Sequence, residues 1–276
     1  MTAAETATAQ RNGAYADVNG VHLYYETNGS GRPLILLHGG LFSTENFDPI
    51  LPQLAANHHV IAVDLQGHGR TADIDRPLDA RLMAEDIAAL IGNLGLDRPD
   101  VVGYSLGGAV ALFTAVNHPE LVGKLVITSA HAWRDAIYAE MLPQQAAVSA
   151  AAIEFLKETP MYELYQRVAP RPDDFGRLLD KIGASMAKDF DYSDVIAGLQ
   201  VPTMIACADA DMAPPSHYVE LFGLLDGGKR DGGWMGEGRP VGGHALAVLP
   251  GLTHYSIGAS PLFAEAVLAF LEAPRP

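Results

Sequence analysis

The sequence predicts an α/β fold: a doubly wound, mostly parallel sheet of about eight strands with a helical cap insertion. Three observations support this prediction. Short apolar runs alternate with amphipathic segments along most of the chain. The dipeptide Asn19-Gly20, between two strand-like runs, favours an antiparallel hairpin at the start. The alternation then stops between residues 131 and 200 and resumes at Thr203.

The predicted strands are short apolar runs, as expected for strands of a sheet that is covered on both faces. Two of them flank the Asn19-Gly20 turn, and the others follow along the chain. Their expected ranges are 14–18, 21–26, 34–37, 59–63, 100–102, 124–128, 203–207 and 245–249. The amphipathic segments between them predict helices over 44–56, 80–94, 105–117, about 216–225 and 260–271. This order of elements indicates a parallel sheet with an antiparallel start.

Residues 131–200 contain several helical patterns separated by prolines and no convincing strand pattern. We interpret this segment as a helical cap, and residues 1–130 and 201–276 as the α/β core. The cap carries Trp133 and further aromatic and methionine side chains. Most of these side chains are expected to pack within the cap, and a few are expected to face the cleft between cap and core.

Composition favours a soluble protein and disfavours several classes of partner. The 276 residues are 49% hydrophobic and 18% charged, which is enough for a large core. A formal net charge of -15 repels phosphate backbones, so no nucleic acid partner is expected. The apolar run 101–116 is too short to cross a bilayer, so no membrane insertion is expected. With the single cysteine Cys207 and no legible secretory signal, we expect a cytoplasmic protein, monomeric or homodimeric.

The sequence Gly103-Tyr104-Ser105-Leu106-Gly107 lies between an apolar strand-like run and an apolar helical run. A serine on a very tight strand-to-helix turn projects its hydroxyl clear of the backbone, and small residues two places away let the turn close. This placement predicts that Ser105 is a nucleophile. A serine hydroxyl is a poor nucleophile near neutral pH, so it needs an imidazole base, which in turn needs a carboxylate.

Other motifs follow the predicted strands in a specific order. His38-Gly39-Gly40 follows one strand, the segment 64–69 follows the next, Asp209-Ala210-Asp211 follows a later one, and a loop ending at His254 follows the last. Together with the serine motif, these segments resemble the α/β-hydrolase superfamily, and within it the cofactor-free esterases, lactonases and perhydrolases. The resemblance covers nearly the whole chain except the cap and residues 227–243.

The resemblance implies the remaining catalytic roles. His254 would be the general base and Asp211 the acid that orients it. The backbone N–H groups of Gly40 and Leu106 would form the oxyanion hole, which stabilises the tetrahedral intermediate.

Asp209 is a second candidate for the acid, because it follows the same strand as Asp211. We prefer Asp211, because in the family the acid tends to precede a proline by four places, and Pro215 stands there.

Five side chains are expected to contact the substrate: Leu41, Tyr104, His131, Trp133 and Trp234. The glycine-rich residues 227–243 form either an exposed connection or a mobile lip in which Trp234 covers the substrate. The sequence has no motif for a metal or a dinucleotide, so neither a metal ion nor another cofactor is expected.

The predicted function is a serine hydrolase that cleaves a neutral, largely apolar carboxylic ester or lactone through an acyl-enzyme. A perhydrolase or a carbon-carbon bond hydrolase with the same triad is an alternative, and so is a ligand sensor that retains the triad. The resemblance disfavours dehalogenases and epoxide hydrolases, whose relatives carry an aspartate nucleophile where Ser105 stands.

Overall fold

An antiparallel hairpin forms one edge of the sheet in the computed structural model, which describes residues 12–235 and 243–274. Strand β1 (Gly13–Val18) pairs with β2 (Val21–Asn28), and Asn19 and Gly20 connect them. Both turn residues have positive φ, 48° and 83°, as a two-residue hairpin turn requires. Strand β2 also runs antiparallel to β4 (His58–Val63), so the predicted antiparallel start is confirmed.

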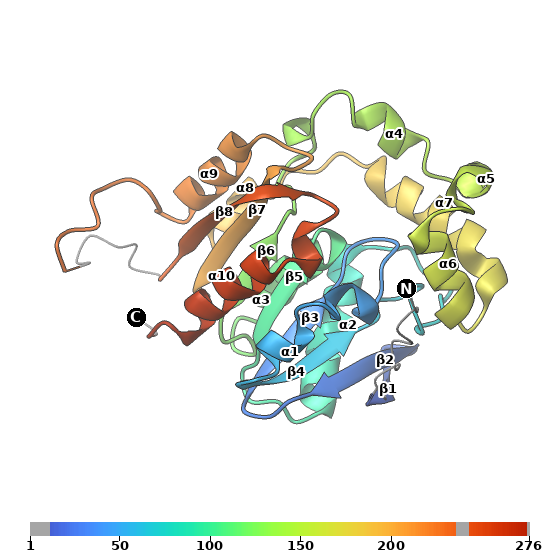
Figure 1. The fold of residues 1–276 in the computed structure, drawn as a ribbon, viewed down its shortest axis with the longest axis horizontal. Coiled ribbons are helices and arrows are strands. Elements are labelled where there is room, and N and C mark those ends of the chain that lie inside the picture. The colour runs from blue at the N-terminus through green and yellow to red at the C-terminus, as the bar shows by residue number, and fades with distance from the viewer. Residues whose placement is uncertain (1–11, 236–242, 275–276) are drawn as a thin grey trace, which may run out of the picture.

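The other strands run parallel to one another, and the whole sheet has the order β1-β2-β4-β3-β5-β6-β7-β8 (Figure 1). Each predicted strand is present, with small differences at its ends. The remaining bounds are β3 (Arg32–Leu37), β5 (Asp100–Tyr104), β6 (Leu125–Thr128), β7 (Thr203–Ala210) and β8 (Ala245–Thr253).

Helices cover both faces of the sheet, which explains why its central strands are apolar at almost every position. In β3, Ile35 and Leu37 belong to one buried cluster, whereas Leu34 and Leu36 belong to another. The first cluster contains residues of α2 (Ala80–Asn93), α3 (Leu106–Asn117) and α9 (Pro215–Leu224). The second contains residues of α1 (Leu51–Leu54) and α10 (Pro261–Glu272), on the opposite face (Figure 1).

The helix predicted over 44–56 is divided into two short pieces. Residues Thr44–Phe47 form a 3-10 turn, η1, and α1 begins only at Leu51. Pro49 lies between them and has no backbone N–H, so it cannot make the hydrogen bond that would continue the helix.

Helices alone connect β6 to β7, and the structure describes every residue of this connection. Figure 1 shows α4 to α7 grouped on one side of the molecule, away from α10. An isolated bridge between Trp133 and Asp191 joins the two ends of the segment. Its helices are η2 (Arg134–Ala136), α4 (Leu142–Ala146), η3 (Ala150–Ala152), α5 (Ile153–Leu156), α6 (Pro160–Val168), η4 (Pro172–Asp174), α7 (Phe175–Met186) and α8 (Ser193–Ala197).

Ion pairs and apolar contacts attach α6 and α7 to the loops that follow the strands. In α7, Lys181 Nζ lies 2.6 Å and Arg177 Nε 2.8 Å from Asp73 Oδ2. In α6, Arg167 lies 2.6 Å from Glu45. Phe175 of α7 belongs to the same buried cluster as Ile35 and Leu37 of β3. None of the helices in the described ranges is long and apolar enough to cross a bilayer.

Candidate active site

Ser105 occupies a strained turn between β5 and α3. Its φ of 53° and ψ of -115° lie in a region that residues other than glycine rarely adopt. A Cβ at Gly103 would lie 2.1 Å from the Gly107 carbonyl oxygen, and one at Gly107 would lie 2.2 Å from the Leu37 carbonyl oxygen. These contacts explain why the turn needs glycine on both sides of the serine.

Three side chains from distant parts of the chain form one line of hydrogen bonds. The Ser105 hydroxyl lies 3.1 Å from Nε2 of His254, and Nδ1 of His254 lies 2.7 Å from Oδ1 of Asp211. His254 is 6% exposed and Asp211 8%, so the line is largely shielded from water. Each residue follows a strand of the sheet, namely β5, β8 and β7, because the carboxyl ends of parallel strands meet at one edge.

Asp211 is held by several donors besides His254. Ser129 donates to its Oδ2 at 2.5 Å, and the backbone N–H of Met212 donates to Oδ1 at 2.8 Å. Burial by itself would raise the pKa of Asp211, but the hydrogen bonds from His254, Ser129 and Met212 hold this pKa at about 2. The carboxylate is therefore charged at neutral pH.

The structure brings Asp211 to His254 and gives Asp209 a different contact. Asp209 is exposed, and its Oδ2 accepts a hydrogen bond of 3.0 Å from the backbone N–H of Gly251. This contact joins the ends of β7 and β8 next to the loop that carries His254.

The loop after β3 lies directly against Ser105. A Cβ at Gly39 would lie 3.2 Å from the Ser105 Cβ, and the N–H of Gly107 donates to the His38 carbonyl oxygen at 3.1 Å. Neither the N–H of Gly40 nor that of Leu106 has an acceptor among the described residues. Both N–H groups are therefore without an acceptor in the described part of the chain, one directly after Ser105 and the other in the loop that packs against it.

His38 joins this loop to the loop that follows β4. Its Nδ1–H donates to the Gly39 carbonyl oxygen at 2.7 Å, and its Nε2 accepts from the N–H of Leu65 at 3.1 Å. Because both ring nitrogens are used in the neutral form, protonation would break a hydrogen bond. Burial, together with nearby His68, lowers the pKa of His38 to about 3. His38 therefore has a structural role in positioning Gly39 and Gly40.

Tyr104 does not line the substrate site, contrary to expectation. Alternation along β5 places it on the face covered by α1 and α10, where it is 1% exposed. Its hydroxyl donates to the backbone carbonyl of His254 at 2.6 Å, so Tyr104 positions the loop that carries the imidazole. Leu41 is half-buried with a positive φ of 65°, directly after Gly40.

His131 and Trp133 lie near the line of hydrogen bonds, after β6. The His131 ring is nearly parallel to the His254 ring, with centroids 6.3 Å apart. Trp133 packs edge to face on His217, with centroids 4.4 Å apart.

The path of the chain leads Trp234 away from Ser105, which favours an exposed connection over a lip that covers the substrate. Helix α9 returns from the carboxyl edge of the sheet, and the segment after it leads to the amino end of β8. Residues 225–235 therefore lie toward the opposite edge from His254, and the Trp234 side chain is 98% exposed. The rest of the predicted lip, residues 236–242, lies outside the described residues.

Sequence reasoning missed three side chains around Asp211: Ser129, His217 and Tyr218. Ser129 contacts Asp211 directly, while His217 and Tyr218 occupy the first turn of α9. The available signal was positional, since each residue follows a strand end at the carboxyl edge. No group of three or more metal-ligating side chains is found in the described ranges.

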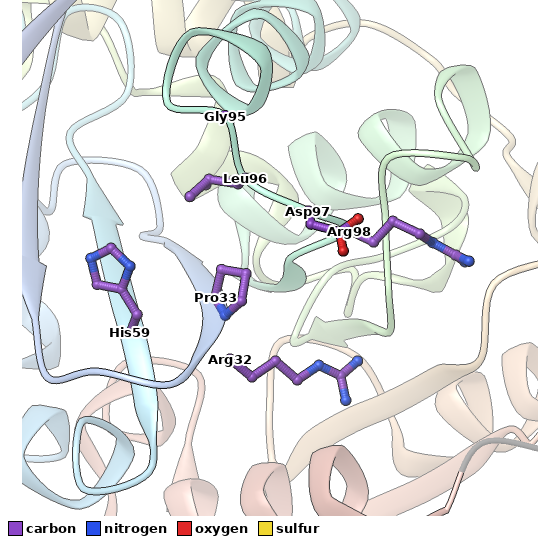
Figure 2. A pocket seen from close by; sticks show the side chains of 7 residues that line it. All are labelled: Arg32, Pro33, His59, Gly95, Leu96, Asp97 and Arg98. Carbon is purple, nitrogen blue, oxygen red and sulfur yellow. The ribbon is translucent and has the colours of Figure 1, made fainter.

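A surface cavity of about 450 Å³ lies at the amino edge of the sheet (Figure 2). It is lined by the starts of β3 and β4 and by the segment before β5, including Arg32, His59 and Arg98. Ligands of open α/β sheets bind at the carboxyl ends of the strands, so we do not associate this cavity with Ser105.

Comparisons with known proteins find similarity to several hydrolases, over part of the chain in sequence and over most of it in fold. Residues 32–149 match the family model of the alpha/beta hydrolase fold. The chain is 41% identical over 115 residues to a soluble epoxide hydrolase of Corynebacterium sp. (strain C12), a match that covers 41% of this chain and 39% of that protein. It is 42% identical over 102 residues to a pimeloyl-(acyl-carrier protein) methyl ester esterase of Neisseria meningitidis serogroup B, covering 37% of each.

The chain thus spans about two fifths of the length of each of these two curated relatives. A solved structure, that of E-2-(acetamidomethylene)succinate hydrolase, matches 95% of this chain and 100% of its own with a TM-score of 0.74 and 21% identity. The family model matches residues 32–149, and the solved structure shares the fold over almost the whole chain, so the fold is that of an alpha/beta hydrolase.

Proposed function

We propose that this protein is a serine hydrolase that cleaves a neutral, largely apolar carboxylic ester or lactone through an acyl-enzyme. The observation that carries the proposal is the unbroken line of hydrogen bonds from Ser105 through His254 to Asp211. The similarity to a methyl ester esterase supports it over part of the chain. The similarity to an epoxide hydrolase carries less weight here, because Ser105 stands where that class carries an aspartate nucleophile.

In the first half-reaction, Ser105 Oγ attacks the ester carbonyl carbon while its proton passes to Nε2 of His254. The charged Asp211 carboxylate stabilises the imidazolium and fixes its orientation. The N–H groups of Gly40 and Leu106 donate to the oxyanion of the tetrahedral intermediate. The intermediate collapses as the bond to the alcohol oxygen breaks, and that oxygen takes the proton from His254.

In the second half-reaction, a water molecule attacks the acyl-enzyme and gives its proton to His254. The bond between the acyl carbon and Ser105 then breaks, and Ser105 takes back the proton. The acid is released and the free enzyme is restored. With a net charge of -15, the protein is better suited to a neutral ester than to an anionic one.

The test is hydrolysis of p-nitrophenyl butyrate by the whole chain. We expect a burst of p-nitrophenol followed by steady turnover, and labelling of Ser105 by a fluorophosphonate. Ser105→Ala should lower kcat by about 10⁴-fold or more, because the remaining groups cannot supply a nucleophile. Ser149→Ala, on the surface of the cap, is the matched control.

Two results would contradict the proposal. Full activity of Ser105→Ala, or a fluorophosphonate label on another residue, would mean that Ser105 is not the nucleophile. One slow acylation without turnover would instead indicate a ligand sensor that retains the triad.

A further inference from the structure

Two histidines beside the triad each have an enclosed ring nitrogen without a hydrogen-bond partner. The atoms are Nδ1 of His217 and Nε2 of His131, and no partner for either exists among the described residues. His217 is 3% exposed. An unpaired buried polar atom destabilises the folded state, so a site that keeps two of them calls for an interaction that uses them. We refer to His131 and His217 as the histidine pair.

The position of the proton on His217 follows from its other contact. Nε2 of His217 accepts a hydrogen bond of 3.3 Å from the backbone N–H of Ala132, so a neutral ring carries its proton on Nδ1. Burial lowers the pKa of His217 to about 4. Burial and the proximity of His254 lower that of His131 to about 4 as well. Both rings are therefore neutral at pH 7.

The two enclosed atoms are complementary. Nδ1–H of His217 is a donor, and Nε2 of His131 can act as an acceptor. The ring centroids are 6.0 Å apart, whereas an in-line N–H···N bond of about 2.9 Å would place them about 5 Å apart. A hydrogen bond between them would need the two rings to come about 1 Å closer with these two atoms facing each other. In that state His131 carries its own proton on Nδ1, which is the ring nitrogen that is not enclosed.

His131 lies beside the imidazole that gives its proton to the leaving alcohol in the proposed reaction. Its ring lies alongside that of His254, and the two planes differ by 13°. The catalytic imidazole delivers its proton to the leaving oxygen, so the groups next to that imidazole face the alcohol and not the acyl chain.

We propose that Nδ1–H of His131 donates a hydrogen bond to a neutral oxygen in the alcohol half of the substrate, and that His217 holds His131 in this tautomer. The substrate is then an ester whose alcohol carries an ether or carbonyl oxygen a few bonds from the ester oxygen. This inference rests on the proposed function. A neutral donor suits a neutral acceptor, whereas a carboxylate would favour the charged form of the ring.

The experiment compares 2-methoxyethyl butyrate with n-butyl butyrate, which differ by one oxygen in place of a methylene. The readout is the ratio of their kcat/KM values, after correction for their rates of alkaline hydrolysis. His131→Phe removes the donor but keeps a flat ring, and we expect the ratio to fall about tenfold, as for one hydrogen bond. His131→Asn places an amide N–H near the position of Nδ1 and should restore most of the ratio.

His217 acts only through His131, so His217→Leu should lower the same ratio about threefold, because His131 is then free to adopt either tautomer. A purely structural role would lower both kcat/KM values without changing the ratio. His22→Phe, at an exposed histidine of β2, is the control and should leave the ratio unchanged. Melting temperatures of all variants show whether they fold.

A ratio unchanged in His131→Phe would overturn the proposal while the proposed function stands. The ¹⁵N shifts of the His131 ring give a second test that needs no turnover: a proton on Nδ1 supports the proposal, and a proton on Nε2 overturns it. If the whole chain hydrolyses neither ester faster than Ser105→Ala does, the proposed function fails, and the ring shifts alone decide the tautomer.

Discussion

Two glycine-rich segments of this chain lie at different edges of the sheet and behave in opposite ways. Around Ser105, a Cβ at Gly103 or Gly107 would lie within 2.2 Å of a backbone oxygen. In the segment after α9, a Cβ at Gly232 would meet nothing within 4 Å, and the nearby Trp234 is 98% exposed. Gly103 and Gly107 permit close backbone contacts at the carboxyl edge, whereas a larger side chain would fit at position 232 without a clash.

The comparison shows that the position of a glycine in the fold decides whether a larger residue could replace it. At the carboxyl edge, the ends of β3 and β5 approach so closely that the loop carrying Gly40 rests on Ser105. The segment after α9 leads toward the amino end of β8, where a Cβ at Gly232 would meet nothing within 4 Å, although one at Gly227 would lie 2.3 Å from the Phe222 ring. A substitution should therefore be severe at Gly103 and mild at Gly232.

Asp211→Asn should have the largest effect. An amide cannot stabilise the imidazolium of His254 and favours the wrong tautomer, so kcat for p-nitrophenyl butyrate should fall by about 10⁴-fold with little change in KM. Asp209→Asn is the matched control at the same strand end and should keep kcat within about threefold. The reverse pattern would make Asp209 the acid.

Gly103→Ala should destabilise the protein by about 3 kcal/mol or more, because the new methyl group would lie 2.1 Å from the Gly107 carbonyl oxygen. For a chain of this size, the melting temperature should fall by about 5–10 °C. Gly232→Ala, in the contrasting segment, should change it by less than about 1 °C. Calorimetry on both variants checks the pair, and equal melting temperatures would refute the stated contrast.

The strands could be predicted from sequence because burial on both faces leaves a direct record in the residue types, as in the run Leu34 to Leu37. The meeting of Ser105, His254 and Asp211 could be predicted because parallel strands bring their carboxyl ends together. Contacts between loops cannot be recognised from the residue types in the same way. Nothing in the sequence places Ser129 on Asp211, or turns Tyr104 toward α10 and away from the substrate. Of the two alternatives for residues 227–243, the exposed connection fits the path of the chain after α9, which leads to the amino end of β8.

The free energy of unfolding at acidic pH tests whether the carboxyl edge of the sheet excludes water. Burial lowers the pKa of His38 to about 3 and that of His68 to about 4. Each stays neutral in the folded state but takes up a proton near pH 6.5 when unfolded, so stability is greatest above pH 6.5 and falls as the pH drops toward 4. Each histidine contributes about 1.4 kcal/mol per pH unit in this window.

His68→Asn isolates one of these contributions. Nδ1 of His68 donates to the Gln66 carbonyl oxygen at 2.9 Å, and an asparagine amide can replace that donor without titrating. Burial raises the pKa of Asp64 to about 6, and this opposes the histidines below pH 6 in both proteins, so it cancels in the comparison. Denaturant unfolding at pH 7 and pH 5 should show a smaller loss of stability in the variant. Equal losses would mean that water reaches the His68 ring.

Trp234→Ala should have the smallest effect. The side chain is 98% exposed in the segment that leads to the amino end of β8, so its removal uncovers little apolar surface and touches no group near Ser105. We expect kcat/KM for p-nitrophenyl butyrate and p-nitrophenyl octanoate to stay within about twofold, and the melting temperature within about 1 °C. Trp133→Ala, which removes a ring packed on His217, is the contrasting variant and should lower the melting temperature by several degrees. A changed preference for acyl chain length in Trp234→Ala would mean that this segment folds over Ser105 when substrate binds, and the contrast between the two edges would no longer hold.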